Sequence, residues 1–204
     1  MGIIRFMDVS LAVILMPFAL ALFVLLLLPQ LACFGAVFYK NERIGRNGLA
    51  FRYVKLKSMR DVSQAGGGRA HLETWRIPAW GRFIRKTHLD ELPELFFILA
   101  GRESFVGPRP LLPDHAALVD SPERRALKPG WTGFSQIFLK TRGILPSRIQ
   151  RRLDRKLGRE LCPSLYIQLL CATFCAYRRR PASPGPTVLA YRESIQARQG
   201  EKNE

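Results

Sequence analysis

One long stretch without charged side chains constrains this chain more than any other feature of its sequence. Residues Val9 to Tyr39 contain no Asp, Glu, Lys or Arg. As one continuous helix this stretch is about 46 Å long, against a bilayer hydrocarbon core of about 30 Å. Pro17 and Pro29 interrupt it, and proline inside a helix removes a backbone hydrogen bond and bends the helix. The stretch therefore predicts a membrane segment.

The topology of this segment is open on hydropathy alone. A cleaved lipoprotein signal ending at Cys33 is disfavoured, because Gln30 stands where such a signal needs an aliphatic residue. The stretch is too long for one simple crossing, but hydropathy alone favours one spanning helix over a re-entrant hairpin bent at Pro17. The hairpin has the merit of keeping Arg5 and Asp8 on one side of the membrane. In either case the basic residues that follow place the rest of the chain in the cytoplasm: Lys40, Arg43 and Arg46.

The remainder of the chain is strongly basic, which indicates anionic partners. Lys and Arg number 32 against 16 Asp and Glu, a formal charge of +16. With an apolar segment beside the basic part, a membrane surface ranks above nucleic acid, since each basic residue near an anionic leaflet contributes about 1 kcal/mol. The length of 204 residues suits one catalytic domain and a short accessory segment. The cysteines and histidines are too scattered for a disulfide or zinc framework, so we expect reduced thiols.

A short basic hairpin is expected at residues 43–59. Asn47-Gly48 is a strong turn signal, and apolar residues alternate with basic ones after it. Two interpretations remain open for Lys55 on the second strand. It lies on a solvated basic surface, or it faces a phosphate.

The run from Trp80 to Leu99 carries the most chemical information. Thr87 is expected to cap a helix whose first turn holds Asp90, Glu91 and Pro93. Two acids in a first turn can simply complement the helix dipole. They can equally serve catalysis, and the run by itself does not decide between the two.

The basic residues around these acids favour phosphoryl chemistry. Arg82, Arg85 and Lys86 precede them, and Arg109 follows between two prolines. A guanidinium held in a stiff loop is suited to bidentate phosphate binding. One carboxylate can act as the nucleophile toward phosphorus while its neighbour helps to hold a divalent cation. Further along, residues 128–136 form a rigid turn, 161–177 read as a core helix, and 181–204 read as a loosely ordered tail.

The order of these motifs resembles the bacterial sugar transferases, the small monotopic phosphoglycosyl transferases. The resemblance runs from Arg5-x-x-Asp8 to about Thr173. Its elements are the apolar segment with Pro17, Arg43-x-Gly45 with Phe51 and Lys55, Leu89-Asp90-Glu91-Leu92-Pro93, Val106-Gly107-Pro108-Arg109-Pro110 and Pro129-Gly130-Trp131-Thr132-Gly133. Five elements in family order make the resemblance specific.

The resemblance implies a membrane enzyme that starts lipid-linked glycan synthesis. It implies a re-entrant helix with Pro17 as the bend, on the cytoplasmic face of the bacterial inner membrane. Asp90 would attack the sugar-linked phosphate of a UDP-sugar, release UMP, and hold the sugar phosphate until undecaprenyl phosphate accepts it. Glu91 would assist with Mg²⁺ or proton handling, and both acids are candidate magnesium ligands. The expected substrate and phosphate-binding residues are Lys55, Arg85, Arg109, Lys128 and Lys140.

Several positions depart from the family pattern. Met16 replaces a serine before Pro17, and His88 replaces a serine or threonine. Arg102-Glu103 stands where the family has Asp-Met. Lys140 lies in a segment that replaces Asn-Gly-Arg, so either it or Arg142 takes the place of that arginine. The sugar cannot be read from the sequence, because its contacts fall in such segments.

The expected fold is α+β and mostly helical, with a small β-hairpin and no doubly wound sheet. The expected organisation is a membrane helix at residues 1–39, a transferase domain at 40–180 and a tail at 181–204. The expected partners are the UDP-sugar, undecaprenyl phosphate and membrane lipids, without nucleic acid, and a homodimer stays open. The alternative is a membrane-tethered nucleic-acid-binding or regulatory protein, which leaves Asp90, Glu91 and Arg109 without a role.

Overall fold

The computed structural model describes residues 2–61 and 74–178 of the chain. These residues form two compact units, and each is described by itself. The first unit comprises residues 2–44 and 50–103, and the second comprises residues 45–49 and 104–178. The tail expected at 181–204 lies outside the described residues.

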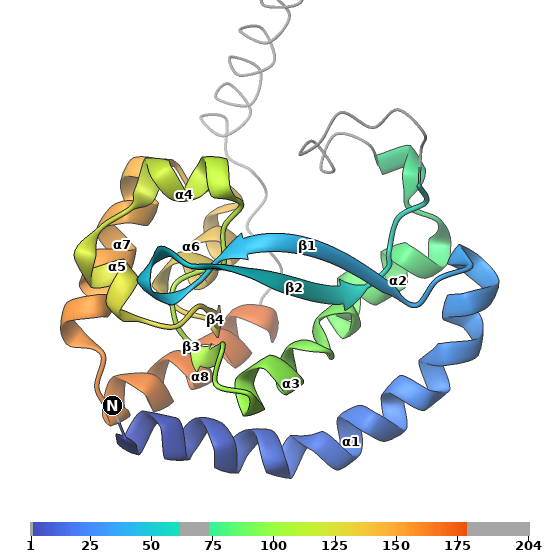
Figure 1. Ribbon diagram of the computed structural model, residues 1–204, viewed down its shortest axis with the longest axis horizontal. Helices are drawn as coiled ribbons and strands as arrows, with labels where there is room; N and C mark the ends of the chain where they lie inside the picture. Colours follow the sequence, from blue (N-terminus) through green and yellow to red (C-terminus); the bar gives the residue numbers. More distant parts are fainter. Residues whose placement is uncertain (1, 62–73, 179–204) are drawn as a thin grey trace, which may run out of the picture. The chain divides into compact units, whose positions relative to one another are not determined.

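The first unit begins with a long, gently curved helix, α1 (Gly2–Phe34), shown in dark blue in Figure 1. It continues as one helix through both Pro17 and Pro29, so the sharp reversal at Pro17 implied by a hairpin is absent. A stripe of residues faces the unit and is buried: Asp8, Ala12, Ala19, Leu26 and Gln30. The opposite side is apolar and exposed, including Phe18 and Leu25 at 73% and Leu28 at 78%. The helix is long and apolar enough to cross a membrane.

Both ends of α1 are held by side-chain hydrogen bonds to the same unit. Near its start, the Arg5 guanidinium donates to the carbonyls of Ile98 and Leu99 at 2.5 and 2.6 Å. Near its end, the Gln30 amide donates to the carbonyls of Val37 and Lys57 at 3.2 and 2.5 Å. The Gln30 carbonyl also accepts a hydrogen bond of 3.1 Å from the indole of Trp80. The two polar residues therefore fix both ends of a mostly apolar helix.

The expected hairpin is present as β1 (Phe38–Ile44) and β2 (Ala50–Leu56), which pair antiparallel. Between them Asn47 and Gly48 adopt φ angles of 59° and 75° within the short 3₁₀ turn η1 (Arg46–Gly48). Asn and Gly adopt positive φ most readily, which is why this pair predicts the turn. The first strand begins at Phe38, inside the range expected for the membrane segment, because α1 ends at Phe34.

The acid-bearing run folds differently from the prediction. Helix α2 (Ala79–Thr87) follows the 3₁₀ turn η2 (Thr74–Arg76) and ends, rather than begins, at Thr87. The Thr87 hydroxyl donates back to the carbonyls of Phe83 and Ile84 at 2.8 and 3.1 Å. His88 then takes a left-handed conformation with φ 58°, which ends the helix. The expectation that Thr87 caps a following helix is therefore wrong.

Two short elements follow His88 and complete the first unit. They are the 3₁₀ turn η3 (Leu89–Glu91) and the helix α3 (Glu94–Leu99). Pro93 is the cap residue of α3, so Asp90 and Glu91 lie in the turn before this helix rather than in its first turn. Figure 1 shows α2 and α3 in succession, in green.

The second unit is built from five helices and two short strands among its described residues. In chain order they are β3 (Ser104–Val106), α4 (Pro113–Val119), α5 (Pro122–Ala126), β4 (Gly130–Thr132), α6 (Phe134–Arg142), α7 (Ser147–Glu160) and α8 (Pro163–Arg178). Strands β3 and β4 pair in parallel, which the sequence did not predict. A Cβ on Gly107 would lie 2.2 Å from the Lys128 carbonyl oxygen, so only glycine permits this close approach.

A buried ion pair ties three helices of this unit together. Arg124 on α5 pairs with Asp154 on α7, and both side chains are nearly inaccessible. The Ser135 hydroxyl on α6 donates to the same carboxylate at 2.6 Å. Breaking a buried pair of this kind leaves an uncompensated charge and costs about 3–5 kcal/mol.

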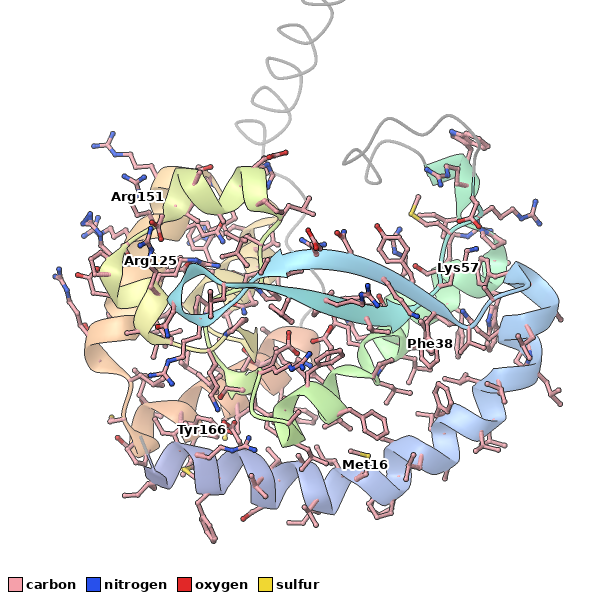
Figure 2. The ribbon with its side chains drawn as sticks, in the orientation of Figure 1. Met16, Phe38, Lys57, Arg125, Arg151 and Tyr166 are labelled. Carbon is pink, nitrogen blue, oxygen red and sulfur yellow. The ribbon has the colours of Figure 1, made fainter. Side chains whose placement is uncertain are left out.

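Helix α8 is both a core helix and an exposed apolar surface. Tyr166, labelled in Figure 2, is only 1% exposed. On the other side Ile167 and Phe174 are 53% and 64% exposed, beside the free thiols of Cys171 and Cys175. The expected core role therefore holds for one side of this helix only.

The fold class is confirmed at its coarse level. The described residues are mostly helical, with one antiparallel hairpin and an apolar amino-terminal helix. They contain two two-stranded sheets and no doubly wound sheet.

Candidate active site

The predicted reactive acids lie in a tight turn between two helices of the first unit. The left-handed His88 reverses the chain after α2, and η3 then carries Asp90 and Glu91. The side chains of these acids are 13% and 29% exposed, so both reach solvent while being largely enclosed. This turn fixes two adjacent carboxylates at the edge of the unit.

Lys55 of β2 brings the acids together. Its ammonium lies 2.5 Å from Glu91 Oε1, 3.4 Å from Glu94 Oε1 and 4.0 Å from Asp90 Oδ2. Of the two interpretations of Lys55, the solvated surface is excluded, because its side chain is only 22% exposed. The ammonium cancels part of the negative charge of the turn.

Glu94 and Tyr53 form the buried floor of this cluster, and neither was predicted from the sequence. Glu94 opens α3 and is 2% exposed, and the Tyr53 hydroxyl donates to its carboxylate. Tyr53 and Lys55 are two residues apart on β2, so their side chains leave the strand on the same side. The two-residue spacing of Tyr53 and Lys55, together with the three-residue spacing of Glu91 and Glu94, is the sequence signal that could have indicated this cluster of four side chains.

Glu103 is a further buried acid in the first unit. It is 1% exposed, and neither carboxylate oxygen has a hydrogen-bond partner among the described residues. Burial, then the negative charge of Glu94, raises its pKa to about 9. Burial, then the charge of Glu91, likewise raises the pKa of Glu94 to about 8. Both carboxyls therefore hold their protons to a higher pH than an exposed glutamate does.

The charges around Asp90 and Lys55 shift the pKa values of both groups. Burial raises the pKa of Asp90 above its usual value, with the Glu91 carboxylate adding to the rise and Lys55 opposing it. Burial tends to lower the pKa of Lys55, but Glu94, Glu91 and Asp90 outweigh it and the pKa is raised. Lys55 is therefore fully charged at neutral pH. Arg85 of α2 also acts on Asp90, since its positive charge lowers the pKa of that acid.

The other predicted phosphate-binding residues belong to the second unit. Arg109 is exposed in the loop after β3, and its main-chain carbonyl accepts a hydrogen bond of 2.5 Å from Arg124. Its loop packs against the turn that carries Lys128, because the Gly130 amide donates to the Pro108 carbonyl at 3.0 Å. Lys140 is half-buried in α6. The structure thus brings the predicted residues together in two groups. Lys55, Asp90 and Glu91 form one group in the first unit, and the segments of Arg109 and Lys128 form the other in the second unit.

The two carboxylates suit a magnesium ion whose remaining ligands are water and a substrate phosphate. No group of three or more His, Cys, Asp or Glu side chains able to hold a metal occurs among the described residues. Mg²⁺ commonly uses only one or two carboxylates and completes its shell with water and phosphate. Asp90 and Glu91, adjacent and partly exposed, provide that number.

Comparisons with known proteins agree with the motifs. Residues 2–180 match the family model described as bacterial sugar transferase. The chain is 39% identical over 117 residues to a putative undecaprenyl-phosphate N-acetylgalactosaminyl 1-phosphate transferase of Bacillus subtilis, covering 55% of this chain and 64% of that protein. It is 34% identical over 152 residues to the exopolysaccharide production protein ExoY of Sinorhizobium fredii, covering 65% and 67%.

A third similar protein is the undecaprenyl-phosphate galactose phosphotransferase of Salmonella typhimurium. The chain is 40% identical to it over 122 residues, covering 50% of this chain and 25% of that protein. Across the curated relatives, the match spans from 21% to 67% of the relative's own length. The family model nevertheless covers nearly the whole chain, and we conclude that this chain belongs to the bacterial sugar transferase family.

Proposed function

We propose that this chain transfers a sugar 1-phosphate from a UDP-sugar to undecaprenyl phosphate, as the first step of lipid-linked glycan synthesis. The observation that carries the proposal is the enclosed turn whose acids, Asp90 and Glu91, both lie within 4.0 Å of the ammonium of Lys55 on β2. The names of similar proteins support the class of reaction and the lipid acceptor.

In the first half-reaction a carboxylate oxygen of Asp90 attacks the phosphorus that bears the sugar. The bond from this phosphorus to the bridging oxygen of the diphosphate breaks, and UMP leaves with the electron pair. The sugar phosphate is then held on Asp90 as an acyl phosphate. Lys55 pairs with Glu91 at 2.5 Å and lies 4.0 Å from Asp90, so Asp90 is the less tightly paired of the two acids.

In the second half-reaction a phosphate oxygen of undecaprenyl phosphate attacks the same phosphorus. The bond to Asp90 breaks, the carboxylate is regenerated, and the sugar leaves on an undecaprenyl diphosphate. One phosphate site thus serves two large substrates in turn, and one phosphoanhydride is exchanged for another.

Charge neutralisation is assigned to the basic residues and to magnesium. Mg²⁺, when bound, neutralises part of the charge of the diphosphate and so assists departure of UMP. Asp90 and Glu91 would hold it. Arg85, Arg109, Lys128 and Lys140 are the proposed contacts to substrate phosphates, with the planar guanidinium of Arg109 gripping two oxygens at once.

We also propose that α1, which is curved but has no sharp reversal, dips into the membrane and returns to the same, cytoplasmic, face of the inner membrane. Its exposed apolar side supports contact with lipid. Arg5 and Gln30 lie roughly 38 Å apart along a straight helix, a length sufficient to cross the hydrocarbon core. Yet both bind main-chain carbonyls of one unit, which supports a re-entrant path over a crossing.

A substrate panel tests the proposed reaction. The purified chain in nanodiscs is given undecaprenyl phosphate, Mg²⁺ and one UDP-sugar at a time, and released UMP is measured. Repeated turnover with at least one sugar, which requires both the lipid acceptor and Asp90, is the expected result, and without the acceptor release should stop at one UMP per chain. Absence of UMP with every sugar, from protein shown to be folded, would refute the proposal.

A further inference from the structure

Helix α7 carries a row of arginines on its outward side. The helix contains six basic residues and two acidic ones. Four of the arginines, Arg148, Arg152, Arg155 and Arg159, follow one another at intervals of three or four residues and are exposed. We call these four the α7 arginine stripe. At about 100° per residue they lie within about 60° of one another around the helix axis.

The stripe lies directly opposite the side of α7 that packs into the unit. Gln150, Asp154 and Leu157 are the buried residues of this helix, and they fall roughly 180° from the stripe. The stripe extends for about 16 Å along the axis. Arg151, labelled in Figure 2, lies beside it on the same helix.

The acids of α7 leave most of this charge uncompensated. Asp154 is buried and paired with Arg124, and Glu160 lies 3.8 Å from Lys156. Within the stripe, Arg159 pairs with Glu123 of the second unit at 2.7 Å. No ion pair of Arg148, Arg152 or Arg155 occurs within the part of the chain that the structure describes. Three guanidiniums in a row are thus available to an anionic surface.

We propose that the α7 arginine stripe binds the anionic phospholipid headgroups of the membrane. Guanidinium groups bind phosphate oxygens in a bidentate manner, and a stripe of this length can contact several phosphates at once. The neighbouring helix favours a membrane over nucleic acid. Only Leu161 and Cys162 separate α7 from α8, whose outer side exposes Ile167 and Phe174, and such apolar side chains suit lipid rather than a phosphate backbone.

The inference rests on the membrane association proposed above but not on the transfer reaction. The stripe would add an electrostatic contact, from the second unit, to the apolar contact that α1 makes from the first. Each arginine close to an anionic surface contributes roughly a fivefold increase in partitioning, so three contribute about 100-fold. The contact should weaken as salt is added, because exposed charges are screened.

The test compares partitioning of the full chain onto two kinds of vesicle. One is phosphatidylcholine alone, and the other contains one third phosphatidylglycerol. The ratio of the two partition coefficients is measured at low salt for the unaltered chain and for a triple variant, Arg148→Gln, Arg152→Gln and Arg155→Gln. A second triple variant with lysine at these positions keeps the charge. The matched control, Arg52→Gln, Arg60→Gln and Lys86→Gln, removes three exposed charges from the first unit.

We expect the glutamine variant to lower this ratio by about 100-fold, while the lysine variant and the matched control change it by only a few-fold. The inactive Asp90→Asn chain should keep the full ratio. Equal losses in the glutamine variant and in the control, or no loss in either, would overturn the proposal. Failure of the unaltered chain to bind either vesicle would overturn the proposed membrane association as well. If the glutamine variant instead loses binding to a DNA duplex and keeps its lipid ratio, the stripe is a nucleic-acid surface and the proposal is wrong.

Discussion

The ammonium of Lys55 and the carboxylate of Glu91 lie 2.5 Å apart, across the gap between a β-strand and the turn that carries the predicted nucleophile. The same ammonium lies 4.0 Å from Asp90. Lys55 is therefore paired mainly with the second acid, which leaves the first less tightly held. The proposed division of roles between the two acids motivates the first and the last of the predictions below.

Replacement of Lys55 tests whether its charge serves the reaction. Lys55→Met should reduce UMP release by about 100-fold, because removing a fixed charge at the reacting groups typically has an effect of that size. Lys57→Met is the matched control. Lys57 pairs at 2.5 Å with Asp61, which is exposed, and lies outside the acid cluster. Equal activity in the two variants would show that Lys55 has no special role.

Replacement of Arg109 tests whether a planar guanidinium is needed in its loop. Arg109→Lys keeps the charge but loses the two-pronged donor, so turnover should fall by about 10-fold or more while membrane association stays unchanged. Arg125→Lys is the control, since Arg125 is an exposed arginine of the same unit that binds Asp120 through two nitrogens. Unchanged turnover in Arg109→Lys would remove Arg109 from the site.

The pair of Arg124 and Asp154 should matter for both stability and the Arg109 loop. Asp154→Leu leaves Arg124 buried without a counter-charge and should destabilise the second unit by about 3–5 kcal/mol. The double variant Arg124→Met with Asp154→Leu should recover much of that loss, because both charges are gone. It should still lose activity, since the hydrogen bond from Arg124 to the Arg109 carbonyl is also lost. Thermal unfolding and UMP release, measured on the same preparations, separate the two effects.

Stability should decline with alkaline pH because of the two buried acids. The pKa values of Glu94 and Glu103 are raised to about 8 and about 9, so the folded chain holds these protons more tightly than the unfolded chain. Their favourable effect on folding is complete below about pH 4 and is lost as the pH rises through those values. Glu103→Met introduces the residue that is usual in the family at this position. It should raise the melting temperature at pH values near 9 and make the melting temperature less dependent on pH. Glu160→Gln, an exposed acid, is the control, and an unchanged pH dependence in Glu103→Met would contradict the assignment.

The topology of α1 can be tested by labelling from outside the cell. In a chain whose four cysteines are replaced by serine, a single cysteine at Gly2 should not react with an impermeant thiol reagent in intact spheroplasts. It should react once the membrane is permeabilised, which is the control for accessibility. Labelling of intact spheroplasts at Gly2 would mean that α1 crosses the membrane.

The sequence predicted those parts of the fold that local chemistry determines. Asn47 and Gly48 mark the hairpin turn because their positive φ angles are readily adopted only by such residues. The apolar segment predicted α1, although it could not show that Arg5 and Gln30 fix the two ends to one unit. The parallel pairing of β3 and β4 escaped prediction because each strand has three residues, too few to show a period.

The local structure predicted for the segment that carries Asp90 and Glu91 was wrong. Thr87 has a hydroxyl suited to capping a following helix, yet it bonds backward to Phe83 and Ile84 at the end of α2. Whether Thr87 ends one helix or begins the next depends on His88 adopting a positive φ, and histidine does not favour a positive φ strongly enough for this to be predicted. Glu94 was overlooked because an acid at the start of a helix usually complements the helix dipole. Only its contacts with Tyr53 and Lys55 show that it belongs to the same cluster as Asp90 and Glu91.

The proposal that Asp90 carries a covalent sugar phosphate is tested most directly by intact-protein mass spectrometry. The chain is incubated with a UDP-sugar that supports UMP release, without lipid acceptor, and the protein is weighed before and after. We expect the mass of one sugar phosphate to be added to the unaltered chain, to a fraction of Glu91→Gln, and to none of Asp90→Asn. An adduct on Asp90→Asn, or one mapped to Glu91 in the unaltered chain, would contradict the proposed mechanism.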